Sequence, residues 1–297
     1  MLALLIIPVA LGIGLIMSIF DDDDDTVRAP DEPETPDPDL EFLQENPLNV
    51  DAFEGSDAAE QMVGNNNGTE ILGFGGNDLI EANGGDDAID AGTGDDTVFA
   101  GDGNDFAVGG AGDDRVFLGD GNDQYVAAAA DAEYMEGDDF VRGGAGNDMI
   151  RDYHGSNVLR GDTGNDFLFG GDDDPFAERG TNADLGKADT LHGGYGNDML
   201  NGDDGDVFTG GEGVDSFGVG VSQDRTEDEV TITDFDPATE QLILYVFNPV
   251  DPNAPDFEIE LQAADDGVDV FLDDRLVATL SNLGAADIDA INVSVQA

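Results

Sequence analysis

A period of nine residues runs through the middle of the chain and limits what the chain can fold into. Six consecutive copies extend from Gly73 to Val126. In every copy the fourth residue is glycine, the sixth is aspartate, and the eighth is aliphatic or aromatic. A biased composition alone does not hold three positions in one register. The segment is therefore a structural repeat rather than low-complexity sequence.

The repeat continues beyond Val126 with interruptions. One insertion lies near residues 127–142 and a second near residues 170–183. Between them, one copy is degenerate, because Asn157 stands at the sixth position and Asp152 begins a copy that lacks the glycine pair. Weaker copies follow the second insertion before the period fades. We therefore place the repeat region at residues 64–220.

Each nine-residue unit predicts a turn followed by a very short strand. Glycine adopts positive φ in the turn without steric cost. Residues seven to nine form the strand, and the eighth side chain points inward. Two units make one coil, so every second unit stacks on the same edge at the ~4.8 Å spacing of neighbouring strands. The sequence thus predicts an all-β fold of stacked coils.

Stacking brings the sixth-position aspartates of successive coils together, so that Asp78 faces Asp96 and Asp96 faces Asp114. Ca²⁺ takes oxygen ligands at about 2.3–2.6 Å, and two such bonds span the gap between coils. Glycine carbonyls in the turns complete the shell. Mg²⁺ fits less well, since it requires shorter bonds in a strict octahedron. The repeat therefore predicts several Ca²⁺ ions between turns.

The candidate ligands occupy two positions of the repeat. The carboxylates are Asp78, Asp87, Asp96, Asp105, Asp114, Asp123, Asp148, Asp166, Asp189, Asp198, Asp206 and Asp215. The glycines of the turns are Gly76, Gly85, Gly94, Gly103, Gly112, Gly121, Gly146, Gly164 and Gly196. Since each coil buries few apolar side chains, burial alone does not offset the ordering of its backbone. We expect a disordered metal-free array that folds on Ca²⁺.

These copies resemble the hemolysin-type calcium-binding repeat, the RTX nonapeptide Gly-Gly-x-Gly-x-Asp-x-U-x. Residues 109–117 and 143–151 match it at every position. The resemblance implies a parallel β-roll that holds Ca²⁺ through backbone carbonyls and the sixth-position aspartate. It also implies folding in external calcium after type I secretion.

Three flanking segments complete the expected organisation. Residues 1–20 are apolar over about the length of one bilayer crossing and predict a hydrophobic helix, either an anchor or a signal. Residues 21–63 are acidic and proline-rich, which predicts a disordered linker. Residues 221–297 alternate apolar and polar residues and predict a β-rich C-terminal cap. Residues 230–237 resemble the segment that follows the roll in many family members, whose C-terminal region carries a type I secretion signal. The apolar segment and this signal imply different export routes, and both stay open.

The net charge of the chain limits the kinds of molecule that it can bind. The chain has 69 acidic residues against 9 Lys and Arg, a formal net charge of −60, which excludes a basic face for nucleic acid. Calcium ions are the expected partner, together with a membrane if residues 2–20 remain attached. The chain has no cysteine, so thiolate metal sites and thiol catalysis are excluded. We expect an extracellular or cell-surface location, with the surface or matrix partner undetermined.

Catalytic constellations are missing from the sequence. His154 lies in the degenerate copy and His192 at a strand position, without the spacing of a metal or nucleophile motif. The paired carboxylates recur with the period of the turns, which favours structural ligation over acid–base chemistry. We expect no catalytic residue, no organic cofactor and a structural or adhesive role. The alternative is a calcium-dependent secreted hydrolase or toxin-like protein with its site in the insertions or the C-terminal region.

Overall fold

The computed structural model describes residues 42–43, 52–127, 137–171, 187–203, 205–222, 229–247 and 257–296. The expected hydrophobic helix at residues 1–20 and most of the linker at 21–63 lie outside these residues. Among the residues described, no helix has the length and apolar character needed to cross a bilayer.

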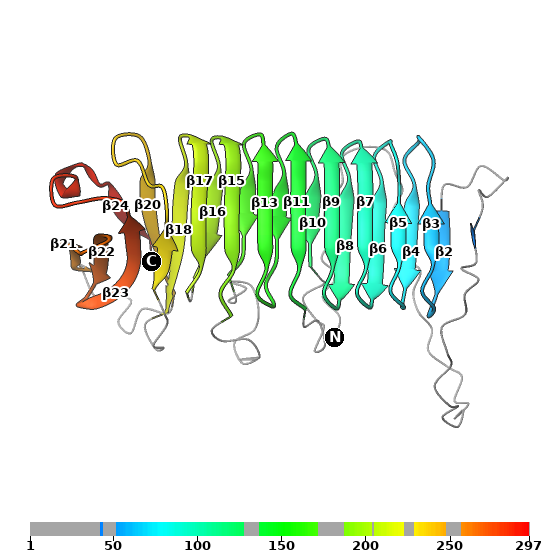
Figure 1. Cartoon of the computed structure of the whole chain (residues 1–297), viewed down its shortest axis with the longest axis horizontal. Coiled ribbons are helices and arrows are strands. Elements are labelled where there is room, and N and C mark those ends of the chain that lie inside the picture. The colour runs from blue at the N-terminus through cyan, green and yellow to red at the C-terminus, as the bar shows by residue number, and fades with distance from the viewer. Residues whose placement is uncertain are drawn as a thin grey trace, which may run out of the picture. The chain divides into compact units, whose positions relative to one another are not determined.

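In the described part of the chain, the strands form two sheets, and strands β1 to β20 alternate between them along the sequence (Figure 1). The first sheet contains, in spatial order, β1 (Phe42–Leu43), β3 (Gln61–Val63), β5 (Leu79–Glu81), β7 (Thr97–Asp102), β9 (Arg115–Asp120), β11 (Phe140–Ala145), β13 (Val158–Thr163), β15 (Thr190–Gly196), β17 (Val207–Gly213), β19 (Val230–Ile232), β23 (Arg275–Ser281), β22 (Gly267–Leu272) and β21 (Ile259–Ala263).

The second sheet contains β2 (Ala52–Ser56), β4 (Glu70–Phe74), β6 (Ala88–Thr93), β8 (Phe106–Ala111), β10 (Gln124–Val126), β12 (Met149–Arg151), β14 (Phe167–Phe169), β16 (Met199–Gly202), β18 (Ser216–Ser222), β20 (Gln241–Phe247) and β24 (Val293–Gln296). Every pairing within it is parallel. Because consecutive strands belong to opposite sheets, each pair of repeats closes one coil.

The register follows the period of the sequence. Val98 of β7 pairs with Val116 of β9, two repeats later, and Ile89 of β6 pairs with Ala107 of β8. The stacking of every second repeat is therefore confirmed. The eighth-position residues line the interior with at most 1% of their surface exposed: Ile80, Ile89, Val98, Ala107, Val116, Tyr125, Ile150, Leu159, Leu168, Leu191 and Leu200.

The first position of the repeat also points inward, which the period did not reveal. Ala82, Ala91, Ala100 and Leu118 are fully buried between the sheets. The interior is consequently built from two residues of each nine. This is the packing expected of strands that alternate between inward and outward residues.

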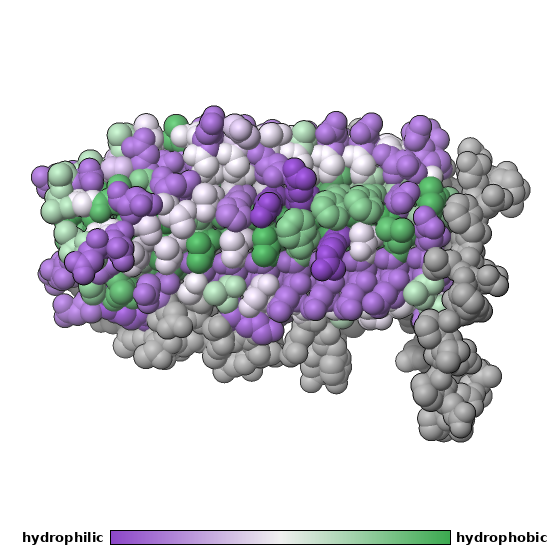
Figure 2. All heavy atoms as spheres, viewed as in Figure 1, coloured by the Kyte–Doolittle hydropathy of each residue, from purple (hydrophilic) through white to green (hydrophobic). Residues whose placement is uncertain are grey.

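The outward face of the first sheet is partly aromatic. The rings of Phe99 and Phe117 stack at 4.9 Å, and the guanidinium of Arg160 lies 5.6 Å from the ring centre of Phe140. Figure 2 shows a hydrophobic band on the visible face, bordered by hydrophilic residues. Cross-strand pairs of this kind stabilise a sheet surface.

The structure differs from the expected boundaries at both ends of the roll. Strands β2 and β3 already stack in the two sheets before residue 64, and β11 begins at Phe140 inside the expected first insertion. Beyond residue 220, β19 and β20 extend both sheets in parallel, and antiparallel pairing is confined to β21, β22 and β23. The coils extend further than the motif because pairing needs an apolar inward residue and a backbone, not a complete set of glycines.

Candidate metal centre

The sixth-position aspartates lie in the turns that lead into the strands, and the structure buries all of them. The twelve predicted carboxylates are at most 3% exposed. An ionised carboxylate without a partner is expensive in such a place. Their surroundings therefore decide what they do.

Each of these carboxylates binds the backbone of the preceding coil. Oδ1 of Asp96 accepts the N–H of Asp78 at 2.7 Å, and Oδ1 of Asp114 accepts the N–H of Asp96 at 2.8 Å. The same bond repeats along two edges of the roll. The edge entering the first sheet runs through Glu60, Asp78, Asp96, Asp114, Asp139, Asn157, Asp189 and Asp206. The edge entering the second sheet runs through Thr69, Asp87, Asp105, Asp123, Asp148, Asp166, Asp198 and Asp215.

The structure thus brings together the predicted neighbours, including Asp148 with Asp166 and Asp198 with Asp215. It also adds Asp139, which the sequence analysis missed. Asp139 accepts the N–H of Asp114 at 2.9 Å, across the 25 residues that contain the first insertion. The signal was present, since Gly137, Asp139 and Val141 have the spacing of the fourth, sixth and eighth positions.

The second carboxylate oxygen has no partner at most of these positions. Buried Oδ2 atoms without a hydrogen bond belong, at the sixth position, to Asp78, Asp87, Asp96, Asp105, Asp114, Asp123, Asp148, Asp166, Asp198 and Asp215; the buried Oδ2 of Asp152, at a first position, also has none. An unsatisfied buried acceptor costs about 1–3 kcal/mol, and a charged one costs more. Because this cost recurs at almost every coil, the metal-free roll carries a large unfavourable contribution to its folding free energy.

Burial has the expected electrostatic effect on these groups. It raises the pKa of Asp114 to about 8 and that of Asp96 to about 7, against the opposing effect of the backbone N–H bond. The neighbouring carboxylates raise both values further. Burial likewise raises the pKa values of Asp87, Asp105, Asp123 and Asp166 to about 7 and those of Asp78, Asp148 and Asp198 to about 6.

The turn glycines form columns in which successive backbones approach closely. Gly94 has a φ of 127°, and a Cβ there would overlap with the carbonyl oxygen of Gly76 in the preceding coil. Positive φ recurs at Gly76, Gly85, Gly103, Gly112, Gly146, Gly164 and Gly196. At Gly121 the requirement for glycine comes from close packing alone, because a Cβ there would overlap with the carbonyl oxygen of Gly103. The fourth-position glycines therefore let the backbones of successive turns pack directly against each other.

The turns of Asp206, a predicted ligand, and of Asn157 differ from the others. Oδ2 of Asp206 accepts the N–H of Asp203 at 2.8 Å, and Oδ1 of Asp206 accepts the N–H of Asp189 at 2.7 Å. Both oxygens of Asp206 are thus engaged by backbone. In the degenerate copy, Nδ2 of Asn157 donates to the carbonyl of His154 at 3.0 Å, which closes that turn with an amide. These turns offer less to a cation than the regular ones.

The oxygen-only chemistry fits Ca²⁺. Unpartnered carboxylate oxygens of adjacent coils and the turn carbonyls are the hard ligands that this ion takes in numbers of six to eight. Within the residues described, no three acidic or histidine side chains converge as a metal cluster. A bound ion would accordingly need backbone carbonyls beside the aspartates. It would supply the positive charge that the buried carboxylates lack.

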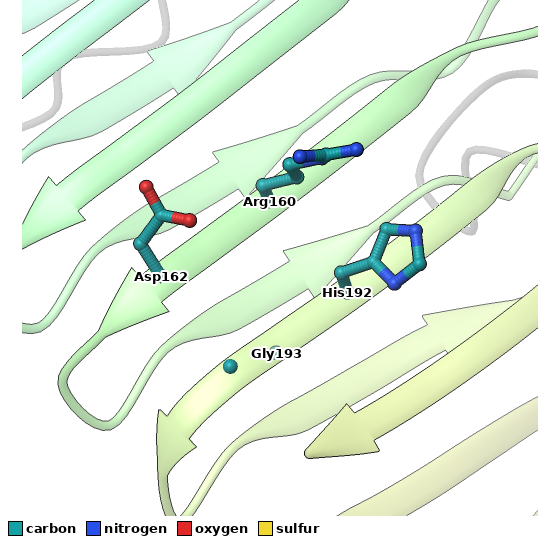
Figure 3. A pocket seen from close by; sticks show the side chains of 5 residues that line it. Arg160, Asp162, His192 and Gly193 are labelled. Atoms are coloured by element: carbon teal, nitrogen blue, oxygen red, sulfur yellow. The ribbon is translucent and has the colours of Figure 1, made fainter. Parts of the chain in front are cut away.

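The two histidines, for which the sequence predicted no site role, do not belong to these edges. His192 lines a shallow hollow with Arg160, Asp162, Gly193 and Gly194 on the outer face of the first sheet (Figure 3). Asp162 is paired with Arg142, and burial together with Arg160 lowers the pKa of His192. The hollow contains no hydroxyl or thiol nucleophile among its lining residues. His154 is part of the degenerate turn.

Comparison with known families agrees with this geometry. The family model of the RTX calcium-binding nonapeptide repeat, four copies long, matches residues 72–107, 90–125, 135–151, 154–174 and 185–217. The matched residues include Asp139, and they end before β20. No curated protein matches the chain.

Proposed function

Because the chain carries RTX calcium-binding repeats, we propose that it is a non-enzymatic extracellular or cell-surface protein whose roll folds on Ca²⁺ and serves as a rigid structural or adhesive element. The observation that carries this proposal is the periodic set of buried, unpartnered Oδ2 atoms. Such a set opposes folding unless a cation neutralises it, so Ca²⁺ would act as part of the fold.

Calcium dependence would also couple folding to location. The free Ca²⁺ of an extracellular medium lies in the 10⁻⁴–10⁻³ M range to which external calcium modules are tuned. The chain would stay unfolded where calcium is scarce and fold after export, as family members do that leave by type I secretion. The formal net charge of −60 would then keep the folded roll soluble until bound ions offset part of it.

A non-catalytic role is supported by where the acidic residues lie. The buried aspartates follow the period of the coils, and Oδ1 of each accepts a backbone N–H of the preceding coil. A general acid or base needs a free position near a substrate, whereas these groups face the next turn. A hydrolase screen in the presence of Ca²⁺ tests this part, and turnover abolished by His192→Ala would reverse it.

The folding proposal is tested by far-UV circular dichroism of the full chain at pH 8, titrated with Ca²⁺ after treatment with excess chelator. We expect a cooperative gain of β signal with Ca²⁺ and a much smaller gain with Mg²⁺ at the same concentration. Full β structure in chelator at this pH would overturn the proposal.

A further inference from the structure

The two edges of sixth-position residues end differently at the C-terminal side of the roll. Thr231 of β19 pairs with Val207 of β17, so Val230 takes the sixth position after Asp206 and closes that edge with an apolar side chain. Gln241 of β20 pairs with Ser216 of β18, so Glu240 takes the sixth position after Asp215. One edge therefore continues with a carboxylate beyond the last nonapeptide.

Glu240 is held in this position by its own loop. Its Oε2 accepts the N–H of Asp236 at 2.7 Å, and its own N–H donates to the carbonyl of Asp236 at 2.9 Å. Only 7% of its surface is exposed. The short loop from Asp236 to Glu240 thus presents a buried carboxylate to the last turn of the roll.

That carboxylate meets Asp215. The two carboxyl groups lie within hydrogen-bonding reach of each other, and when both are ionised neither supplies a proton. Oδ1 of Asp215 accepts the N–H of Asp198 at 2.9 Å, while its Oδ2 has no donor although the residue is fully buried. A buried acidic pair of this kind has an unmet demand for positive charge.

A third carboxylate adds to this demand. Asp234 accepts the N–H groups of Gly210 and Gly211, both at 2.9 Å, and its charge acts on both Asp215 and Glu240. Gly210 is also the residue beneath Oδ2 of Asp215, since a Cβ on Gly210 would overlap with that oxygen. Asp234 and Asp215 therefore both lie against the turn that contains Gly210.

We propose that Asp215 and Glu240, together with backbone carbonyls of the last turn, bind a Ca²⁺ ion that fastens the C-terminal cap to the roll. This site rests on the proposed calcium binding of the repeats, but it uses a glutamate outside the nonapeptide motif. The ion joins the last turn of the roll to the loop between β19 and β20. Its loading orders the cap as well as the end of the roll.

The site is tested on the full chain with Glu240→Gln, which keeps the shape of the side chain and removes its charge. Asp265→Asn, in an exposed turn of the cap, is the matched control. Bound calcium is counted by native mass spectrometry at saturating Ca²⁺. We expect Glu240→Gln to bind one ion fewer than the wild-type chain and Asp265→Asn to bind the same number.

Hydrogen exchange provides the second measurement. It distinguishes a local effect on the cap from a general loss of folding. In Glu240→Gln, amides of β20 should lose protection at Ca²⁺ concentrations that keep β8 protected, whereas Asp265→Asn should protect both strands. An unchanged ion count in Glu240→Gln, or a loss of protection in β8 and β20 together, overturns the cap site alone. A wild-type chain that binds no calcium overturns the repeat sites as well.

Discussion

Asp114 accepts the backbone N–H of Asp96 at 2.8 Å through Oδ1 and leaves its buried Oδ2 without a donor. The two oxygens of one carboxylate thus have separate tasks. Oδ1 links successive coils through the backbone hydrogen bond, and Oδ2 is left available to bind a cation. An amide at the sixth position can fulfil the first task, as Asn157 shows by accepting the N–H of Asp139 through Oδ1 at 2.9 Å. Only a carboxylate can fulfil the second.

Substituting Asp96 separates these two tasks. Asp96→Asn keeps an acceptor for the N–H of Asp78 and removes the charge, so we expect weaker Ca²⁺ binding with little loss of the backbone bond. Asp96→Ala also leaves that buried N–H unsatisfied, which costs about 1–3 kcal/mol more. Calorimetric Ca²⁺ titration and urea unfolding at saturating Ca²⁺ measure the two effects. Equal stability of the two variants would contradict the division of tasks.

The metal-free chain should respond to pH in the sense opposite to ordinary acid denaturation. The buried aspartates have folded-state pKa values of about 6 to 8, above the value of 3.8 that applies to an exposed aspartate. The folded state therefore binds more protons than the unfolded state between about pH 4 and pH 8, and its stability falls as the pH rises through this window.

In chelator, we accordingly expect more β structure at pH 5 than at pH 8, and at pH 8 we expect Ca²⁺ to be required. Circular dichroism across this range with and without chelator checks both statements. A metal-free chain that gains β structure on going from pH 5 to pH 8 would contradict them.

The period gave the coil register and the ligand neighbours because both follow from spacing alone. Asp139 was missed because residues 127–142 were expected to form an insertion, and Glu240 was missed because it lies beyond the expected repeat region, whereas the strand register places both at the sixth position. Asp152, which begins the degenerate copy, lies fully buried at an inward first position.

The close approach of the glycine columns predicts a steric effect at Gly94. Alanine there would both strain the backbone at a φ of 127° and force its Cβ against the carbonyl of Gly76. We expect a loss of more than about 1–2 kcal/mol, in the range of strained or overpacked positions. Gly284→Ala is the matched control, since the nearest atom to its Cβ would be 3.9 Å away. Urea unfolding in Ca²⁺ compares the two variants, and equal midpoints would refute the steric account.

Tyr125 tests whether the interior of the roll relies on a polar contact at the first insertion. Its ring fills the core, and its hydroxyl donates to Oδ2 of buried Asp139 at 2.8 Å. Tyr125→Phe keeps the ring and leaves Asp139 without that donor, so we expect a loss of about 1–3 kcal/mol. Tyr195→Phe serves as the control, because Tyr195 is 60% exposed. Thermal unfolding at fixed Ca²⁺ measures the difference. If Tyr125→Phe is as stable as Tyr195→Phe, Asp139 is satisfied in some other way, and the carboxylate next to the insertion belongs with the cation-binding set rather than with the core.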